Sequence, residues 1–278
     1  MARTIADVSP RYTSQPMVVI NKTGGAGSIA AAEVIASKPD GSKFVVNSTN
    51  FFAITVKTQK IPFNPAHLVP IASFMEFRMG FIVRADSPWK TLNDLLSYAR
   101  KNPGKLKWAH PGRGLSAHLR TMFMFKKAGI DTIDIPYKGS PEQLVALLGR
   151  HVDASTMVYG GGKEHVKAGK VRFLTVFNDR RYVDLPDVPT AADLGFPEVT
   201  KLMNLVGVYA HKDTPETVQK SLYEVFKKVY EHPGFKEKIE ELGEEPRFEG
   251  REFTKDQIKI NEEVAIPIIK ELGLYVER

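Results

Sequence analysis

The sequence predicts an α/β protein of two lobes, and three observations support this prediction. Its 278 residues exceed the roughly 100 to 150 residues of a common single domain, although one large α/β unit also fits this length. Short apolar segments repeatedly run into a Gly- or Ser-rich turn and then into an amphipathic segment, which favours a largely parallel sheet. With 42% hydrophobic and 26% charged residues, the composition is that of a globular protein.

The short apolar segments that precede these turns are predicted to be strands, because each is bounded by Gly, Pro, Ser or Asn. In chain order they span residues 17–21, 44–49, 79–86, 106–110, 133–137, 152–162, 171–178 and 205–210.

Signals at helix ends support the helical segments between these strands. A helix at 29–37 stops before Pro39, because proline cannot continue it. Thr91 and Asp94 have the spacing of a capping box. Gly129 stands where the helix after residues 112–117 should stop.

The next helix has signals at both ends. Ser140 suits the N-cap, Pro141 suits the first helical position, Gln143 completes a capping box and Gly149 ends the helix. Another helix is expected to start at Thr214, and a mostly helical C-terminus follows.

Lobe boundaries are expected near Gly80 and Gly207, where strands lead into segments of different composition. This predicts a discontinuous first lobe of residues 1–80 and 207–278 and a second lobe of residues 81–206.

Charge and cysteine content exclude several classes of partner. The formal net charge is +7, but Lys and Arg usually lie near Asp or Glu, as in residues 236–247, and no basic stripe with aromatics appears. We therefore expect no nucleic-acid partner, and the positive potential instead favours small anions. The absence of cysteine excludes disulfides, thiolate metal sites and cysteine nucleophiles.

The sequence as given carries no apolar run of the kind found in a signal peptide within residues 1–16. No later segment approaches the roughly 18 apolar residues of a membrane helix.

Strand-turn-helix junctions are the candidate binding elements. A helix N-terminus presents unpaired N–H groups and partial positive charge, so several junctions facing one ligand would hold an anion. Three junctions of small residues fit, at residues 24–28, 112–117 and 139–142. Each alone is weak, because every α/β protein needs glycine in tight turns.

An enzyme that binds a dinucleotide is the main alternative. Residues 112–117 (GRGLSA) fit the GxGxxG/A pattern after a strand. The acidic residue expected at the end of the next strand is absent, because Asp134 lies inside that strand, before Pro136. There is no GxSxG, HExxH or Walker motif, and the histidines form no i, i+4 pair, so we expect no catalytic residue, metal or cofactor.

The same segments resemble the Bug-type receptors, the solute-binding component of tripartite tricarboxylate transporters. The similarity runs over nearly the whole chain as an ordered series of motifs. These motifs are a strand ending at Asn21 before a Gly-Ala-Gly turn, Pro39-Asp40-Gly41, a Gly-rich turn followed by His118, Pro136-Tyr137-Lys138-Gly139, Gly149 to Asp153, and Leu185 to Thr190.

This resemblance implies a periplasmic binding protein fold of type II, with two lobes and a central ligand cleft. Such a receptor performs no chemistry: it closes over a small carboxylate in the periplasm and presents it to a membrane permease. Carried over by motif, the ligand-binding residues would be Ser48 and Asn50 in the first lobe, and Ser116, Ala117, Tyr137, Gly139, Ser140 and Asp153 in the second.

Three departures accompany the resemblance. Residues 1–8 look like the helix that follows the first strand and Gly-rich loop of the family, so these two elements are expected to lie outside this sequence. Leu205 replaces a typical aromatic residue, and His211 replaces a proline. A sensor that passes the same ligands to a membrane kinase would have the same sequence features.

Overall fold

The computed structural model describes residues 1–277, which form two compact units. Unit 1 comprises Met1–Glu76, Asn204–Glu263 and the C-terminal residues from Tyr275, and unit 2 comprises Phe77–Met203 and Val264–Leu274. The division differs from the expected one, because residues 264–274 join unit 2.

Gly80 and Gly207, near which the lobe boundaries were expected, lie inside strands, a few residues after the divisions that follow Glu76 and Met203. A Cβ on Gly80 would lie 2.4 Å from the carbonyl oxygen of Thr175, and a Cβ on Gly207 would lie 2.5 Å from that of Ala72. Both glycines therefore allow a neighbouring strand to approach closely, which is a common reason for glycine within a sheet.

Unit 1 is built on an antiparallel sheet with strand order β1-β8-β2-β9. Its strands are β1 (Phe44–Ser48), β2 (Leu68–Glu76), β8 (Leu205–His211) and β9 (Glu245–Gly250). Its helices are α1 (Ala2–Val8), α2 (Ser28–Ile35), α3 (Val56–Thr58), α9 (Glu216–Glu231), α10 (Pro233–Glu241) and the first part of α11 (Arg251–Glu271).

Unit 2 contains a mixed sheet with strand order β5-β4-β6-β3-β7. Strands β5, β4 and β6 are parallel, whereas β3 is antiparallel to both β6 and β7. Its strands are β3 (Met79–Arg84), β4 (Lys107–His110), β5 (Ile133–Pro136), β6 (Ala154–Val158) and β7 (Val171–Val176), and its helices are α4 (Leu92–Lys101), α5 (Ser116–Lys127), α6 (Ser140–Leu148), α7 (Tyr159–Lys167) and α8 (Pro197–Lys201).

The α/β class and the two-sheet architecture agree with the prediction, but the expectation of a largely parallel sheet is wrong. The sheet of unit 1 is wholly antiparallel, and only β5, β4 and β6 are parallel in unit 2. A strand-turn-helix unit is a local pattern, and it does not fix the direction of the strand that pairs with it.

Residues 17–21, predicted to be the first strand, form no strand in the structure. The side chains of Val18 and Ile20 are 80% and 65% exposed, so this apolar segment packs against little. An isolated segment gains nothing from an extended backbone unless a neighbouring strand accepts its hydrogen bonds.

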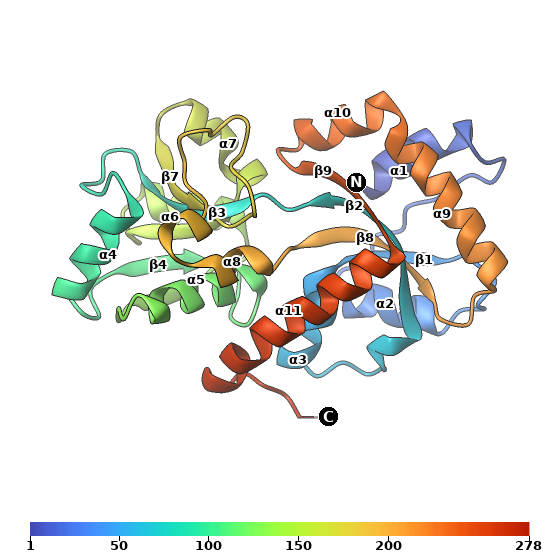
Figure 1. Cartoon of the computed structure of the whole chain (residues 1–278), viewed down its shortest axis with the longest axis horizontal. Helices are drawn as coiled ribbons and strands as arrows, with labels where there is room; N and C mark the ends of the chain where they lie inside the picture. Colours follow the sequence, from blue (N-terminus) through green and yellow to red (C-terminus); the bar gives the residue numbers. More distant parts are fainter. Residues whose placement is uncertain (278) are drawn as a thin grey trace. The chain divides into compact units, whose positions relative to one another are not determined.

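Two hydrophobic clusters cover the two faces of the unit 2 sheet. Phe81 belongs to one cluster and Ile82 to the other, as expected for neighbours whose side chains point to opposite faces of β3. The first cluster contains the apolar sides of α4 and α5, and the second contains those of α6 and the start of α7 (Figure 1).

The predicted helix ends at Thr91, Gly129 and Gly149 are confirmed, whereas the predicted start of α6 is wrong, because Gly139 and not Ser140 is its N-cap. Thr91 and Asp94 form the capping box, and Gly129 follows α5 with a φ of 65°. Gln143 does not reach back to the start of α6. It is buried, and its amide donates to Ser155 Oγ and to the carbonyl oxygen of Thr156 in β6.

Helix α11 contributes to both units, with residues 251–263 in unit 1 and residues 264–271 in unit 2. Pro267 lies inside this helix, and since proline has no N–H, the carbonyl oxygen of Glu263 loses its helical partner there. Within residues 1–277, no helix combines the length and the hydropathy that crossing a bilayer requires.

Candidate functional site

The parallel part of the unit 2 sheet brings three helix N-termini to one edge. Strand β4 leads into α5, β5 leads into α6 and β6 leads directly into α7. Because β5, β4 and β6 are parallel neighbours, their carboxyl ends lie at the same edge. Ligands of open α/β sheets bind at such an edge, and helix N-termini favour anions.

The turn after β4 has the conformation that its glycines permit. Gly112 has a φ of 150° and Gly114 a φ of 74°, values that side-chain-bearing residues rarely adopt. The turn delivers Ser116 and Ala117 to the first turn of α5, where both residues are buried. Among residues 1–277, no side chain caps this helix N-terminus.

The turn after β5 lies beside the first one, because the amide of Tyr137 donates to the carbonyl oxygen of His110 at 2.9 Å. Gly139 is the N-cap of α6, with a φ of 126°, and Ser140 is its first residue. The Glu142 carboxylate accepts from the amide of Lys138 at 3.0 Å. The groups that α6 presents to an anion are therefore the backbone of Gly139 and the backbone and hydroxyl of Ser140.

The third helix N-terminus, that of α7, is absent from the residues predicted to bind ligand. It begins at Tyr159 and continues through Gly160, Gly161 and Gly162. A Cβ on Gly161 would lie 2.6 Å from the Cβ of Ser140, so the first turns of α6 and α7 are in contact. The three consecutive glycines after an apolar strand were the sequence feature that could have indicated this third helix start.

An arginine holds the start of α7 in place. The amide of Tyr159 donates to the carbonyl oxygen of Arg78, and the Arg78 guanidinium lies 4.3 Å from the ring centre of Tyr159 and 4.1 Å from that of Tyr182. Arg78 also forms an ion pair with Asp184. Burial raises the pKa of the Tyr159 hydroxyl, and its hydrogen bond to Asp184 adds to this effect.

Asp153 is not brought together with the other predicted residues. It precedes β6, and its carboxylate accepts from the amide of Lys107 at the start of β4, at 2.9 Å. This position is at the amino ends of the parallel strands, whereas the turns described above follow their carboxyl ends. Asp153 therefore joins the two strands, and we remove it from the candidate site.

In unit 1, the two predicted residues use their side chains within the fold. Ser48, at the end of β1, accepts from the amide of Phe51 at 3.3 Å. Asn50 is buried and accepts from the Asn261 amide of α11 at 2.8 Å. The Gly-rich turn before α2 lies nearby, since a Cβ on Gly27 would lie 3.1 Å from Asn47 Nδ2. That nitrogen has no hydrogen-bond partner among the described residues, and Asn47 was not predicted.

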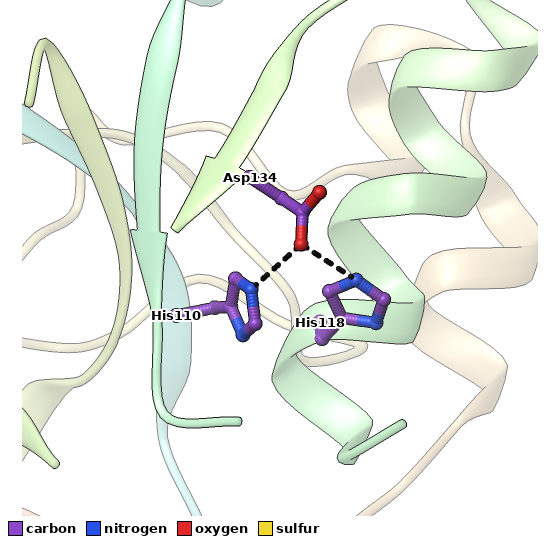
Figure 2. Close-up of side chains that lie close together, drawn as sticks. All are labelled: His110, His118 and Asp134. Atoms are coloured by element: carbon purple, nitrogen blue, oxygen red, sulfur yellow. Dashed lines mark hydrogen bonds and ion pairs between the residues drawn. The ribbon is translucent and has the colours of Figure 1, made fainter. Parts of the chain in front are cut away.

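His110 at the end of β4 and His118 in the first turn of α5 both point toward Asp134 of β5 (Figure 2). His110 Nε2 is 3.0 Å and His118 Nε2 is 3.6 Å from the same oxygen of Asp134. Burial lowers the pKa of His110, and burial together with the nearby His110 lowers the pKa of His118 to about 4. Burial alone would raise the pKa of Asp134, but hydrogen bonds from His110 and Arg113 outweigh it and lower that pKa.

These three side chains are close enough to suggest a metal site, but their hydrogen bonds do not suit one. A histidine that binds metal through Nε2 carries its proton on Nδ1 and donates it to an acceptor. Here the Nδ1 atoms of His110 and His118 accept from backbone amides. The Arg113 guanidinium also occupies the Asp134 carboxylate, which is therefore not free to bind the ribose of a dinucleotide either.

The sequence matches a family model described as the tripartite tricarboxylate transporter family receptor (TctC), over residues 1–274. It is 32% identical over 277 residues to the UPF0065 protein of the gbd 5′ region of Cupriavidus necator, with 98% of this chain and 82% of the relative covered. It is 30% identical over 202 residues to protein BugT of Bordetella pertussis, with 71% of this chain and 62% of that protein covered.

Solved structures show the same fold. The periplasmic binding protein BugD matches with a TM-score of 0.81 and 26% identity, over 99% of this chain and 93% of that one. An R. palustris protein solved with adipate matches with a TM-score of 0.84 and 25% identity, over 98% of this chain and 91% of that one.

Proposed function

Because this chain belongs to the TctC family of tripartite tricarboxylate transporter receptors, whose members are solute-binding proteins and not enzymes, we propose that it captures a small carboxylate and delivers it to a membrane permease. We propose that capture takes place in the periplasm, because the similar protein BugD is named a periplasmic binding protein. Capture would proceed by closure of the two units, since a ligand that contacts both favours the closed state.

One observation carries the carboxylate assignment: α5, α6 and α7 all begin at the same edge of the unit 2 sheet. Their aligned peptide dipoles place partial positive charge there without any dedicated cation. The chain has a formal net charge of +7, which favours the approach of an anion. The relative solved with adipate supports a dicarboxylate among the ligands to test first.

The proposed contacts are the backbone of Ser116 and Ala117 on α5, the backbone of Gly139 before α6, and the backbone and hydroxyl of Ser140 on α6. Tyr137 is retained as a proposed contact because it lies in the turn before α6. It also lines a separate pocket with Pro141, Val145 and His151. In unit 1, Ser48 and Asn50 are retained as backbone contacts, because their side chains are engaged within the fold.

A thermal-shift screen tests the proposal directly. The probes are adipate, other dicarboxylates, tricarboxylates, acidic amino acids, aromatic acids and NADH. A ligand at about a hundred times its dissociation constant adds roughly 2.7 kcal/mol of stability, which raises the midpoint by several degrees. A rise with a carboxylate supports the proposal, whereas a rise with NADH alone contradicts it.

Gly139→Val locates the site, with Gly195→Val as its matched control. Both glycines have positive φ values, 126° and 88°, so a side chain strains the backbone at either position, while a Cβ would meet only Pro141 Cδ at 4.0 Å at Gly139 and nothing within 4 Å at Gly195. Gly139 is the N-cap of α6, whereas Gly195 lies outside the proposed site. We expect Gly139→Val to abolish carboxylate binding in calorimetry and Gly195→Val to retain it. Equal affinities in the two variants would remove the α6 turn from the site.

A further inference from the structure

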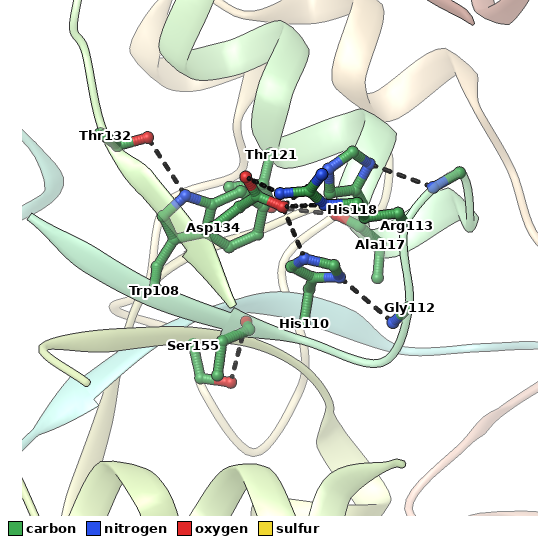
Figure 3. A network of polar contacts seen from close by, with 12 residues as sticks. Trp108, His110, Gly112, Arg113, Ala117, His118, Thr121, Thr132, Asp134 and Ser155 are labelled. Atoms are coloured by element: carbon green, nitrogen blue, oxygen red, sulfur yellow. Dashed lines mark hydrogen bonds and ion pairs between the residues drawn. The ribbon is translucent and has the colours of Figure 1, made fainter. Parts of the chain in front are cut away.

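The turn that leads into α5 is held by hydrogen bonds to two histidine rings. The amide of Gly112 donates to His110 Nδ1 at 3.1 Å (Figure 3). The amide of Gly114 donates to His118 Nδ1 at 3.3 Å. An atom that accepts from an N–H group carries no proton of its own. Both rings are therefore neutral, with their single proton on Nε2.

The Nε2 protons of both rings face Asp134. Its carboxylate also receives the Arg113 guanidinium at 2.9 and 3.1 Å, and Arg113 lies in the turn itself. The Asp134 carboxylate thus orients both rings. Through Arg113 it also holds the turn, in addition to the two histidine contacts. The two imidazole centres are only 4.5 Å apart, and Trp108 stacks on His118.

The rings are almost inaccessible to solvent. The side chain of His110 is 0% exposed and that of His118 is 4% exposed, so water does not replace a lost backbone partner without local opening. Neither histidine is among the proposed ligand contacts, and both rings accept from glycine amides of the turn.

We infer that His110 and His118 are positioning residues, whose Nδ1 atoms hold the Gly112 and Gly114 amides so that the N-terminus of α5 is preorganised to receive a carboxylate. This inference rests on the proposed function for its ligand, but the attachment of the turn is a property of the protein alone. A proton added to either Nδ1 replaces the acceptor with a donor and releases that attachment.

Charged neighbours and burial together control this proton. Burial opposes protonation of both rings most strongly, and Arg113 in the turn also opposes it, whereas Asp134 on β5 favours it. The charge of His110 additionally opposes protonation of His118. Trp108 on β4, the remaining neighbour, carries no charge.

Asparagine and glutamine variants distinguish the role of Nδ1 from that of Nε2 in each ring. Asparagine places its carbonyl oxygen near the position of Nδ1, so His110→Asn and His118→Asn keep an acceptor for the glycine amide. Glutamine places its amide near Nε2, so His110→Gln and His118→Gln keep a donor for Asp134 and lose the acceptor. The pairs are matched in polarity, and melting temperatures establish that each variant is folded.

The primary measurement is amide hydrogen exchange at Gly112 and Gly114, which needs no ligand. We expect exchange about tenfold faster at the affected glycine in the glutamine variants, and close to the original rate in the asparagine variants. Adipate affinity by calorimetry should follow the same order. Unchanged exchange in the glutamine variants, or equal acceleration in both kinds of variant, would overturn the inference.

A lack of adipate binding by the unmodified protein would count against adipate as the ligand and leave the exchange result decisive. If a glutamine variant fails to fold, the unmodified protein is measured between pH 7 and pH 5. After correction for the intrinsic rate, protection at Gly112 and Gly114 should fall relative to the amide of Ala85, which donates to the carbonyl oxygen of Lys170. Equal protection changes at the three amides would contradict the inference.

Discussion

Gly161 in the first turn of α7 faces Ser140 in the first turn of α6, so closely that a Cβ on Gly161 would lie 2.6 Å from the Cβ of Ser140. Real Cβ contacts essentially never reach this distance. The absence of a side chain at Gly161 therefore sets the spacing between two helix N-termini of the proposed anion site.

Gly161→Ala should separate these two helix starts. We expect a loss of about 1 to 3 kcal/mol in the free energy of unfolding, typical of overpacking, and a carboxylate affinity about tenfold weaker. Urea titration and calorimetry measure the two effects. Gly250→Ala is the control, since a Cβ there would make an ordinary contact of 3.7 Å with the Tyr223 hydroxyl. Equal effects of both variants would count against a specific α6–α7 contact.

Asp153→Ala should affect stability and spare ligand binding. The substitution removes the acceptor of the Lys107 amide at the amino end of β4, which costs about 1 kcal/mol. Because this end of the sheet is opposite to the helix N-termini, we expect carboxylate affinity to stay within about twofold of the original. A large loss of affinity, at unchanged stability, would return Asp153 to the site.

Stability should fall as the pH is lowered from about 6.5 to about 4. The pKa of His118 in the folded protein is lowered to about 4, from the usual 6.5, so the unfolded chain takes up the proton first in this window. The contribution of a neutral His118 is complete above pH 6.5 and is lost as the pH approaches 4, at up to about 1.4 kcal/mol per pH unit.

Urea unfolding of the original protein and of His118→Asn measures this loss. The variant keeps the acceptor for Gly114 and lacks the titrating ring, so its stability should depend less on pH across the window. Identical pH dependence in the two proteins would assign the acid sensitivity to other groups.

Ile20→Ala should leave stability nearly unchanged, whereas Ile82→Ala should be costly. Ile20 is 65% exposed and lies in a segment without strand pairing, and Ile82 is fully buried in β3. We expect a change within about 0.5 kcal/mol for the first and a loss of about 2 to 5 kcal/mol for the second. Chemical denaturation of both variants checks the difference. A large effect of Ile20→Ala would show that residues 17–21 pack more tightly in solution.

The sequence predicts local features of this fold well. The Thr91–Asp94 capping box and the stop at Gly129 depend on residues a few positions apart, and both occur in the structure. Pairing direction depends on segments far apart: β1 pairs with β8, more than a hundred residues later in the chain, and no local pattern encodes that partner.

The candidate site shows the same division. The turns at residues 112–117 and 139–142 were identified from their glycines, and the structure places both at one sheet edge. From sequence alone, Gln143 could complete a capping box or make a buried hydrogen bond. The structure shows the second, because β6 lies close enough to accept from its amide. His110, His118 and Asp134 come from three separate elements, so their cluster has no signature along the sequence.

Because α11 contributes residues to both units, no single division of the chain separates it into two complete units. Residues 251–263 belong to one unit, while Ile268 and Ile269, 6% and 0% exposed, are buried in the other. A fragment that ends before residue 264 would expose the surface these isoleucines cover. Chimeras that exchange units between relatives therefore need a third crossover within this helix, and the position near Pro267, where the backbone ladder is already interrupted, is the one that disturbs it least.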